Sequence, residues 1–200
     1  MSQRVVLVRH GETEWSRDHR HTGRTDIDLT ALGSRQGALL AERLRTERFP
    51  AVFTSPLTRA KETCRLAGLG QVAEELDDLR EWDYGEFEGL TTAEIRQTRP
   101  GWTVWTSEVP GGESLAEVGR RADRVIGRIS AVDGDVAVFA HGHLLRVLAA
   151  RWVDLDPMCG ARLALSTATL STLGYERETG VVVRWNEDAH LGEGAPGAGG

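Results

Sequence analysis

The sequence predicts an α/β fold, a three-layer sandwich in which helices cover both faces of a mostly parallel central sheet. Short apolar runs, such as residues 5–8 and 136–140, alternate along the chain with segments whose apolar residues recur at helical spacing. The apolar runs contain no polar break, which is typical of strands buried on both faces. Strands of this kind belong to parallel sheets with helices on either side.

Length and composition indicate one enzyme-sized globular domain. The chain has 200 residues, and we assign residues 1–191 to the domain; residues 192–200 are mostly glycine, alanine and proline, and we expect them to be disordered. The net charge of -6 argues against a general nucleic-acid binder, and no apolar run approaches the ~18 residues of a membrane span. Because there is no signal-peptide pattern, we expect a cytoplasmic protein. Its oligomeric state stays open, a homodimer included.

The first strand is predicted at residues 5–8, and it ends abruptly at Arg9 and His10. In open α/β sheets, ligands bind at the carboxyl ends of the strands. A cation and a titratable side chain at that position are therefore the first candidates for chemistry. Residues 16–24, rich in histidine, arginine and aspartate, are predicted as a charged loop that continues from this corner.

Thr30 is the predicted N-cap of the next helix, which Pro50 ends. Residues 51–54 then form a short strand. The dipeptide Ser55-Pro56 indicates another helix start, with serine as the N-cap and proline at the first helical position.

This helix start places Arg59 within about one turn of a strand's carboxyl end. A helix N-terminus carries unpaired N–H groups and a partial positive charge, so an arginine beside it completes an anion site. The alternative is a surface arginine paired with Glu62 or another carboxylate.

The middle of the chain contains an unusual loop. Residues 72–79 are predicted to be extended, and residues 79–90 then alternate aromatic and acidic side chains without helical periodicity. Packed loops on a rigid scaffold often carry function. Its candidate acid catalysts are Glu81, Asp83, Glu86 and Glu88. For each of them, a solvated carboxylate is the alternative.

Two capping-box patterns open the following helices. Thr91 with Glu94 begins a short helix, and Ser114 with Glu117 begins one that continues to about Ile129. In the second helix, apolar residues recur at the spacing that covers one face of a core.

A second buried strand is predicted at residues 135–140, and it ends in His141-Gly142-His143. The first strand likewise ends in His10-Gly11. If the two strands are neighbours, both histidines lie at the same edge of the sheet.

The chain then continues with a helix at about residues 144–152. Residues 167–176 and 180–185 alternate around a turn at residues 178–180, which predicts an antiparallel pair closing one edge of the sheet.

These candidates favour phosphoryl chemistry over a metal site. Arg9 and Arg59 around His10 would repel a metal cation, but they suit the equatorial oxygens of a phosphoryl group. The paired histidines His141 and His143 suggest a metal-dependent hydrolase as an alternative, although no acidic cluster accompanies them.

The chain resembles the histidine phosphatase superfamily, also called phosphoglycerate mutase-like, over about residues 4–185. Five motifs occur in the family's order: residues 7–13, residues 55–60, Glu81 with Tyr84-Gly85, residues 111–114 and residues 140–143.

The resemblance implies a covalent mechanism without cofactor or metal. A ring nitrogen of His10 would attack phosphorus and form a phosphohistidine, while Arg9, Arg59 and His141 hold the phosphoryl oxygens. Glu81 would protonate the leaving alcohol and later deprotonate the attacking water. Positions that match substrate-binding residues of the family are Thr13, Ser16, Thr22, Gly23, Tyr84 and Gly142.

The resemblance departs from the mutases at three places. Trp82-Asp83 stands where they have Arg-His, Thr92 stands where they have a substrate-binding lysine, and their long basic insertion is missing. The stretch around Glu81 is instead similar to a branch of broad acid phosphatases and sugar-bisphosphate phosphatases. We therefore expect a phosphomonoesterase acting on small phosphate esters, with sugar phosphates as the substrate class. The alternatives are a 2,3-bisphosphoglycerate-dependent phosphoglycerate mutase, a metal-dependent hydrolase and a catalytically inactive binding module.

Overall fold

The computed structural model describes residues 3–192, which form an α/β fold around one six-stranded mixed sheet. The strands are β1 (Val5–Arg9), β2 (Ala51–Thr54), β3 (Ala73–Glu75), β4 (Val136–Ala140), β5 (Leu170–Glu176) and β6 (Thr179–Glu187). Their order is β3-β2-β4-β1-β5-β6; β1 to β4 are parallel, and β5 and β6 form an antiparallel hairpin at one edge. The predicted fold class and the antiparallel edge are confirmed. Apart from Gly192, the predicted disordered tail lies outside the described residues.

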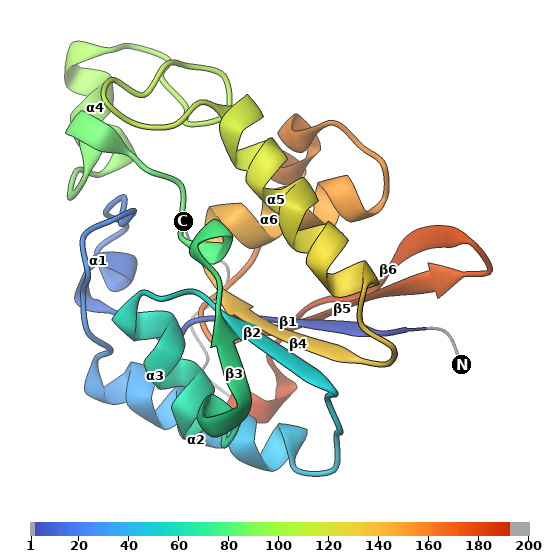
Figure 1. Cartoon of the computed structure of the whole chain (residues 1–200). Coiled ribbons are helices and arrows are strands. Elements are labelled where there is room, and N and C mark those ends of the chain that lie inside the picture. The colour runs from blue at the N-terminus through green and yellow to red at the C-terminus, as the bar shows by residue number, and fades with distance from the viewer. Residues whose placement is uncertain (1–2, 193–200) are drawn as a thin grey trace.

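Helices cover both faces of the sheet and its carboxyl edge. They are α1 (Glu14–Arg17), α2 (Ala31–Leu44), α3 (Thr58–Leu66), α4 (Thr92–Thr98), α5 (Leu115–Ser130) and α6 (Gly142–Trp152). Figure 1 shows α2 and α3 on one face, α5 and α6 on the other, and α1 and α4 beyond the carboxyl end of β1. No helix among residues 3–192 is long and apolar enough to cross a membrane.

The core has two halves, one on each face of the sheet. In β1, Val5 and Leu7 belong to the half under α5 and α6, whereas Val6 and Val8 belong to the half under α2 and α3. Successive side chains of a strand point to opposite faces. This explains why the first strand is apolar at four consecutive positions, and it fixes the carboxyl end of β1 in the middle of the molecule.

Three predicted helix caps are confirmed, and one is wrong. Thr30, Thr91 and Ser114 cap α2, α4 and α5, the last two in capping boxes. The cap predicted at Ser55 does not form, because α3 begins at Thr58 and its N-cap position has no side-chain bond. The buried Ser55 hydroxyl accepts the N–H of Leu57 at 3.3 Å, before the helix, and also bonds the ring of His141, 86 residues away, at 2.8 Å.

Smaller corrections concern local geometry. The predicted loop at residues 16–24 begins inside α1, whose N-cap is Thr13. Of residues 72–79, only Ala73–Glu75 is strand, with a 3₁₀ turn on each side. The β5–β6 turn is centred at residues 177–178, one position earlier than predicted. All three differences concern short turns and the ends of elements, whose exact positions hydrophobic periodicity does not resolve.

Candidate active site

Two histidines lie side by side at the carboxyl edge of the sheet. Because β1 and β4 are neighbours in register, with Arg9 opposite Ala140, the next residues His10 and His141 emerge together. Both side chains are buried, and their ring centroids are 5.2 Å apart. The repeated histidine-glycine strand ending therefore builds one site.

His10 is held as a neutral imidazole with one ring nitrogen available. Its Nδ1 lies 2.7 Å from the carbonyl oxygen of Gly11, so Nδ1 carries the proton and donates it to that bond. Burial, together with the positive charges of Arg59 and Arg9, holds the pKa of His10 well below its usual value of 6.5. The Nε2 atom is then an unprotonated nitrogen on a residue that lines a large cavity.

His141 has both ring nitrogens engaged within the protein. The Nε–H of Arg59 donates to its Nδ1 at 3.1 Å, so Nε2 carries the proton and donates to Ser55 Oγ. Burial and the charge of Arg59 lower the pKa of His141 well below 6.5. The alternative, a surface pair between Arg59 and Glu62, does not form, because Arg59 is fully buried and Glu62 pairs with Arg65.

The guanidinium of Arg59 joins three segments behind the cavity. Besides His141, it donates to the carbonyl oxygens of Thr25, Thr22 and Gly23, each at 3.0 Å. These bonds leave few of its N–H groups for further acceptors, so its effect on His10 is mainly electrostatic.

Arg9 lines the cavity with a donor that has no partner. One terminal nitrogen donates to the carbonyl oxygen of Leu165, whereas the buried Nε has no hydrogen-bond partner among the described residues. A Cβ on Gly142 would lie 3.3 Å from this Nε, so the glycine lets the guanidinium approach the start of α6. Burial lowers the pKa of Arg9 from its usual value. An unsatisfied buried cation is what an anion site presents before its ligand binds.

Glu81 sits against the amino end of α6. Its Oε1 accepts from the N–H groups of Trp82 and Leu144, both at 2.9 Å, and its Oε2 accepts from the N–H of His143 at 3.0 Å. The carboxyl group is buried but lines the same cavity as His10. Of the four carboxylates of the 79–90 loop, Glu81 alone lines this cavity among the described residues.

The other carboxylates of that loop have structural partners. Glu88 accepts the backbone N–H groups of Gly23 and Arg24, and Asp83 accepts from the side chain of Arg24. Glu86, in contrast, is exposed to solvent.

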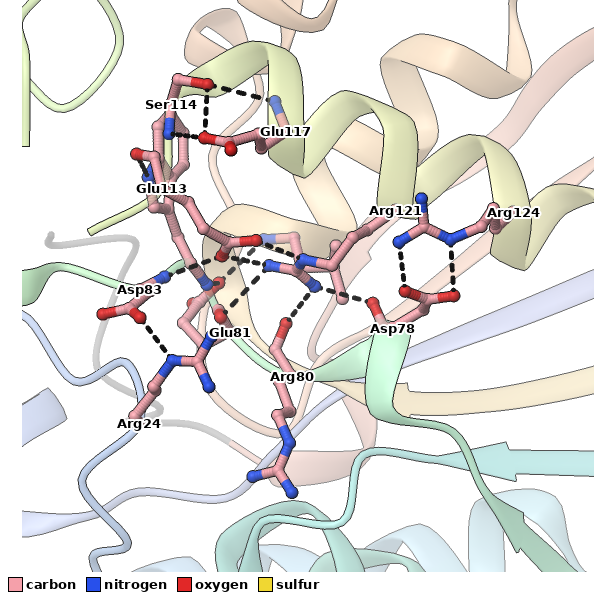
Figure 2. A network of polar contacts seen from close by, with 12 residues as sticks. Arg24, Asp78, Arg80, Glu81, Asp83, Glu113, Ser114, Glu117, Arg121 and Arg124 are labelled. Carbon is pink, nitrogen blue, oxygen red and sulfur yellow. Dashed lines mark hydrogen bonds and ion pairs between the residues drawn. The ribbon is translucent and has the colours of Figure 1, made fainter. Parts of the chain in front are cut away.

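A buried ion pair holds the Glu81 loop in place, as Figure 2 shows. Arg121 of α5 makes two 2.7 Å bonds to the carboxylate of Glu113. Its terminal nitrogens also donate to the carbonyl oxygens of Asp78, Arg80 and Glu81. Three backbone carbonyl groups of the loop are thereby bound to one guanidinium.

The cavity has a volume of about 840 Å³, which is ample for a small organic ligand. Of the eleven residues singled out from the sequence, seven line it: Arg9, His10, Glu81, Ser16, Thr22, Tyr84 and Gly142. Arg59 and His141 lie behind His10. Thr13 is buried as the cap of α1, and Gly23 donates its N–H to Glu88, so neither lines the cavity.

His21 lines the cavity but was not singled out from the sequence, and His143 was considered there only as a possible metal ligand. His21 contacts Tyr84 and Trp102 with ring centroids 4.8 and 5.3 Å apart, and His143 contacts Trp105 at 5.2 Å. Burial lowers the pKa of His21 to about 4 and that of His143 well below 6.5. Arginines also line the cavity away from His10, namely Arg20, Arg96, Arg146 and Arg162. No local pattern marks these residues, because they meet only in the folded chain.

The two histidines after β4, His141 and His143, have different hydrogen-bond partners. The nitrogens of His141 bond Arg59 and Ser55, and Nδ1 of His143 lies 2.7 Å from the hydroxyl of Tyr84. Within residues 3–192, no group of three or more histidine, cysteine, aspartate or glutamate side chains is arranged to hold a metal ion.

The fold and the site together define an α/β enzyme with an anion site built around a neutral histidine. The sequence model of the histidine phosphatase superfamily, branch 1, matches residues 5–188, and the chain belongs to this family of phosphatases. It is 42% identical over 179 residues to an acid phosphatase of Mycobacterium tuberculosis, and the aligned region covers 88% of each of the two chains. It is 35% identical to the sedoheptulose 1,7-bisphosphatase of Saccharomyces cerevisiae over 78% of this chain and 69% of that one.

A solved structure of a Mycobacterium tuberculosis open reading frame has the same fold. It superposes with a TM-score of 0.87 at 40% sequence identity and covers 92% of this chain and 97% of that one.

Proposed function

We propose that this histidine phosphatase is a phosphomonoesterase that hydrolyses small sugar phosphates through a phosphohistidine on His10. The observation that carries the proposal is the pairing of a neutral imidazole, whose Nε2 is unprotonated, with the unpartnered buried donor of Arg9 beside the same cavity. A phosphate monoester bound by Arg9 would present its phosphorus to that nitrogen.

The first step forms the phosphoenzyme. Nε2 of His10 attacks phosphorus, the bond from phosphorus to the ester oxygen breaks, and Glu81 donates its proton to the departing alkoxide. Oε2 of Glu81 accepts only one N–H bond, so it retains a position for that proton. Glu81 is left as a carboxylate, stabilised by the backbone N–H group of Trp82 and by those of His143 and Leu144 at the positive end of α6.

The second step returns the enzyme to its starting state. The Glu81 carboxylate takes a proton from water, the water oxygen attacks phosphorus, and the bond from phosphorus to His10 breaks. Inorganic phosphate leaves, and Nε2 regains its lone pair. Each group ends the cycle as it began, so no cofactor is consumed.

Arg59 and His141 support the phosphoryl group from behind. Arg59 contributes positive charge that keeps His10 neutral. His141 would bind a phosphoryl oxygen when its Nε2–H turns from Ser55 to the ligand. Ser16, Thr22, Tyr84 and Gly142 would line the bound ester, and Thr13 and Gly23 would act through the backbone that they position.

Two features support a sugar as the alcohol. His21 and His143 are neutral at pH 7, and with Tyr84 they give a wall of rings and hydroxyl-binding groups. Such a wall suits a polyhydroxy compound better than a long apolar alcohol. The similarity to a sedoheptulose bisphosphatase points in the same direction.

A phosphate-release screen tests the proposal. Sugar phosphates, phosphoglycerates, nucleotides and p-nitrophenyl phosphate are incubated with the wild-type protein and with His10→Ala as control. We expect phosphate release that is fastest with sugar phosphates and absent in the variant. Release from none of them, or loss of activity on chelation, would contradict the proposal.

The mutase alternative is tested in the same assay. The protein is supplied with 3-phosphoglycerate and catalytic 2,3-bisphosphoglycerate. We expect no rapid isomerisation, because Thr92 stands at the cavity where a cation would bind the substrate. Fast formation of 2-phosphoglycerate without phosphate release would show that the protein is a mutase and would contradict the proposed phosphatase activity.

A further inference from the structure

The peptide unit that accepts the Nδ1 proton of His10 is held on its other side by a buried glutamine of α2. This unit, between Gly11 and Glu12, donates its N–H to Oε1 of Gln36 at 2.9 Å. Its carbonyl oxygen lies 2.7 Å from Nδ1 of His10. Within residues 3–192 the unit makes no other hydrogen bond. Gln36 is only 3% exposed, so water does not easily replace it as the acceptor.

The glutamine fixes the direction in which the carbonyl group points. In a planar trans peptide, the N–H and the C=O point to opposite sides. While the N–H is bound to Gln36, the unit cannot turn over, because a buried N–H would then lose its acceptor. The carbonyl oxygen therefore stays directed at His10. Since a carbonyl oxygen only accepts, Nδ1 keeps the ring proton and Nε2 stays unprotonated.

The preceding peptide unit, between His10 and Gly11, is held by α3. Its N–H donates to Oγ1 of Thr63 at 2.9 Å, and its carbonyl oxygen accepts the N–H of Ala168 at 3.0 Å. The Thr63 hydroxyl donates its own proton to the carbonyl oxygen of Arg59 at 2.7 Å, so toward Gly11 it can only accept. Thr63 is fully buried. Both peptide units beside Gly11 are thus bound to helices on one face of the sheet.

Two glycines let α2 approach closely enough for the glutamine contact. A Cβ on Gly11 would lie 2.5 Å from the carbonyl oxygen of Gly33, and a Cβ on Gly33 would collide with the carbonyl oxygen of Glu12. Gln36 follows Gly33 by three residues and therefore lies on the same face of the helix. This face carries the acceptor to the Glu12 N–H.

We propose that Gln36 and Thr63 are positioning residues for the nucleophile: by holding the two peptide units beside Gly11, they keep His10 in the tautomer whose Nε2 can attack phosphorus. Among the described residues that line the cavity, neither is present, so both act through His10. The inference rests on the proposed function, because an unprotonated Nε2 matters for catalysis only if His10 attacks phosphorus.

The tautomer is measured directly in the whole protein. At neutral pH, long-range proton–nitrogen correlation spectra of isotope-labelled histidine distinguish a protonated from an unprotonated ring nitrogen, and the His10 signals are those missing from His10→Ala. We expect the wild type to show protonated Nδ1 and unprotonated Nε2. Gln36→Met keeps the length of the side chain but has no strong acceptor, so it should show a mixture of both tautomers.

Kinetics connect the tautomer to the chemistry. The value of kcat/KM for p-nitrophenyl phosphate reports the steps up to phosphoryl transfer. In Gln36→Met it should fall in proportion to the fraction of His10 that keeps its proton on Nδ1, about tenfold if roughly one tenth remains. The Ki of inorganic phosphate should change by less than about twofold, because Arg9 is untouched.

Thr63→Val tests the second contact and decides the matter if Gln36→Met does not fold. It should shift the tautomer and lower kcat/KM, and Thr63→Ser, which retains the hydroxyl, should recover both. The matched control is Gln3→Met. Gln3 donates to three backbone carbonyl oxygens near the amino end of β1, so this variant should lower Tm but keep the wild-type tautomer and kcat/KM.

The outcomes separate the positioning role from the proposed function. If the wild-type protein releases phosphate from p-nitrophenyl phosphate, and Gln36→Met and Thr63→Val both keep the wild-type tautomer, the positioning role is wrong. A loss of activity without a change of tautomer contradicts it as well, because the two side chains would then only stabilise the fold. If the wild-type protein releases no phosphate, the proposed function fails and the positioning role fails with it.

Discussion

At the scale of single residues, His10 and His141 are prepared for different tasks although their rings lie 5.2 Å apart. The Nδ1–H of His10 donates a hydrogen bond to the carbonyl oxygen of Gly11, which leaves Nε2 unprotonated. His141 has no ring nitrogen left over, because Arg59 and Ser55 bond both. In the proposed mechanism, the hydrogen-bond partners of the two rings therefore make His10, and not His141, the nucleophile.

Ser55 is expected to position His141. In Ser55→Ala the buried Nε2–H of His141 loses its acceptor, which costs on the order of 1–3 kcal/mol and frees the ring to turn. We predict that kcat for p-nitrophenyl phosphate falls about tenfold, and that Ser55→Thr, which retains the hydroxyl, recovers most of it. Steady-state kinetics check this, and an alanine variant with wild-type kcat would show that the contact is dispensable.

The residues that local sequence could identify are those at strand ends. Arg9, His10 and His141 follow continuous apolar runs, so their place at the sheet edge was predictable. Ser55 and His21 were not, because Ser55 meets its partner 86 residues away and His21 lies in a loop without periodicity. Roles that depend on contacts between residues far apart in the sequence can be recognised only in the folded structure.

At the scale of elements, the loop that carries Glu81 depends on α5. Arg121 is nearly buried, pairs with Glu113 and binds the carbonyl oxygens of residues 78, 80 and 81. Figure 2 shows how this one side chain connects the helix to the loop. The helix therefore holds the loop in the position from which, in the proposed mechanism, Glu81 would protonate the leaving group.

Replacing Arg121 should impair leaving-group protonation. Arg121→Met breaks a buried ion pair, which costs roughly 3–5 kcal/mol of stability, and loosens the Glu81 loop. We predict that kcat falls about tenfold or more for a sugar phosphate and clearly less for p-nitrophenyl phosphate, whose leaving group needs little protonation. Kinetics with both substrates, at a temperature where the variant is folded, check this.

The control for this prediction is Arg124→Met. Arg124 lies on the same helix and pairs with Asp78 at an exposed position, and such surface pairs contribute at most about 1 kcal/mol. Its kinetics should equal those of the wild type. Equal losses for both substrates in Arg121→Met would mean that the pair only stabilises the fold.

Element boundaries were predictable where the signal is local. The capping boxes of α4 and α5 close within three residues, and both were identified correctly. The start of α3 was misplaced, because the Ser55 hydroxyl accepts the N–H of Leu57 just before the helix and also bonds His141. The local serine-proline signal therefore located the turn but not the first residue of the helix.

At the scale of the whole molecule, the histidines make stability depend on pH. Five of the six histidines have a pKa below the usual 6.5 in the folded chain, mainly because they are buried: His10, His21, His141, His143 and His190. In the unfolded chain they titrate near their usual value, so the unfolded state binds protons first as the pH falls. Stability is therefore fully present above pH ~6.5 and is lost progressively below it.

We predict that Tm falls by about 5 °C or more between pH 7 and pH 4.5. His21→Gln should reduce this fall, because the pKa of His21 drops to about 4 on folding. The exposed His19→Gln variant is the control and should keep the wild-type dependence. Thermal melts at several pH values check this; a Tm that stays constant down to pH 4.5 would contradict buried neutral histidines.

More of the overall architecture than of the cavity was predictable from the sequence. Continuous apolar strands and helical periodicity indicated a parallel α/β sheet, and the structure has one. The strand order and the gathering of Arg96, Arg146 and Arg162 from three elements were not predictable, because both depend on contacts between distant segments and the net charge of -6 says nothing about where the arginines meet.

The most direct test of the central claim is to trap the phosphoenzyme. Glu81→Gln is mixed with p-nitrophenyl phosphate, whose phosphoryl transfer needs no acid, and the reaction is quenched in alkali. Because the variant cannot deprotonate water, we predict one acid-labile phosphoryl group per chain, mapped by mass spectrometry to the peptide containing His10 and absent from the His10→Ala, Glu81→Gln double variant. A phosphoryl group on another residue, or rapid turnover by His10→Ala alone, would contradict the account.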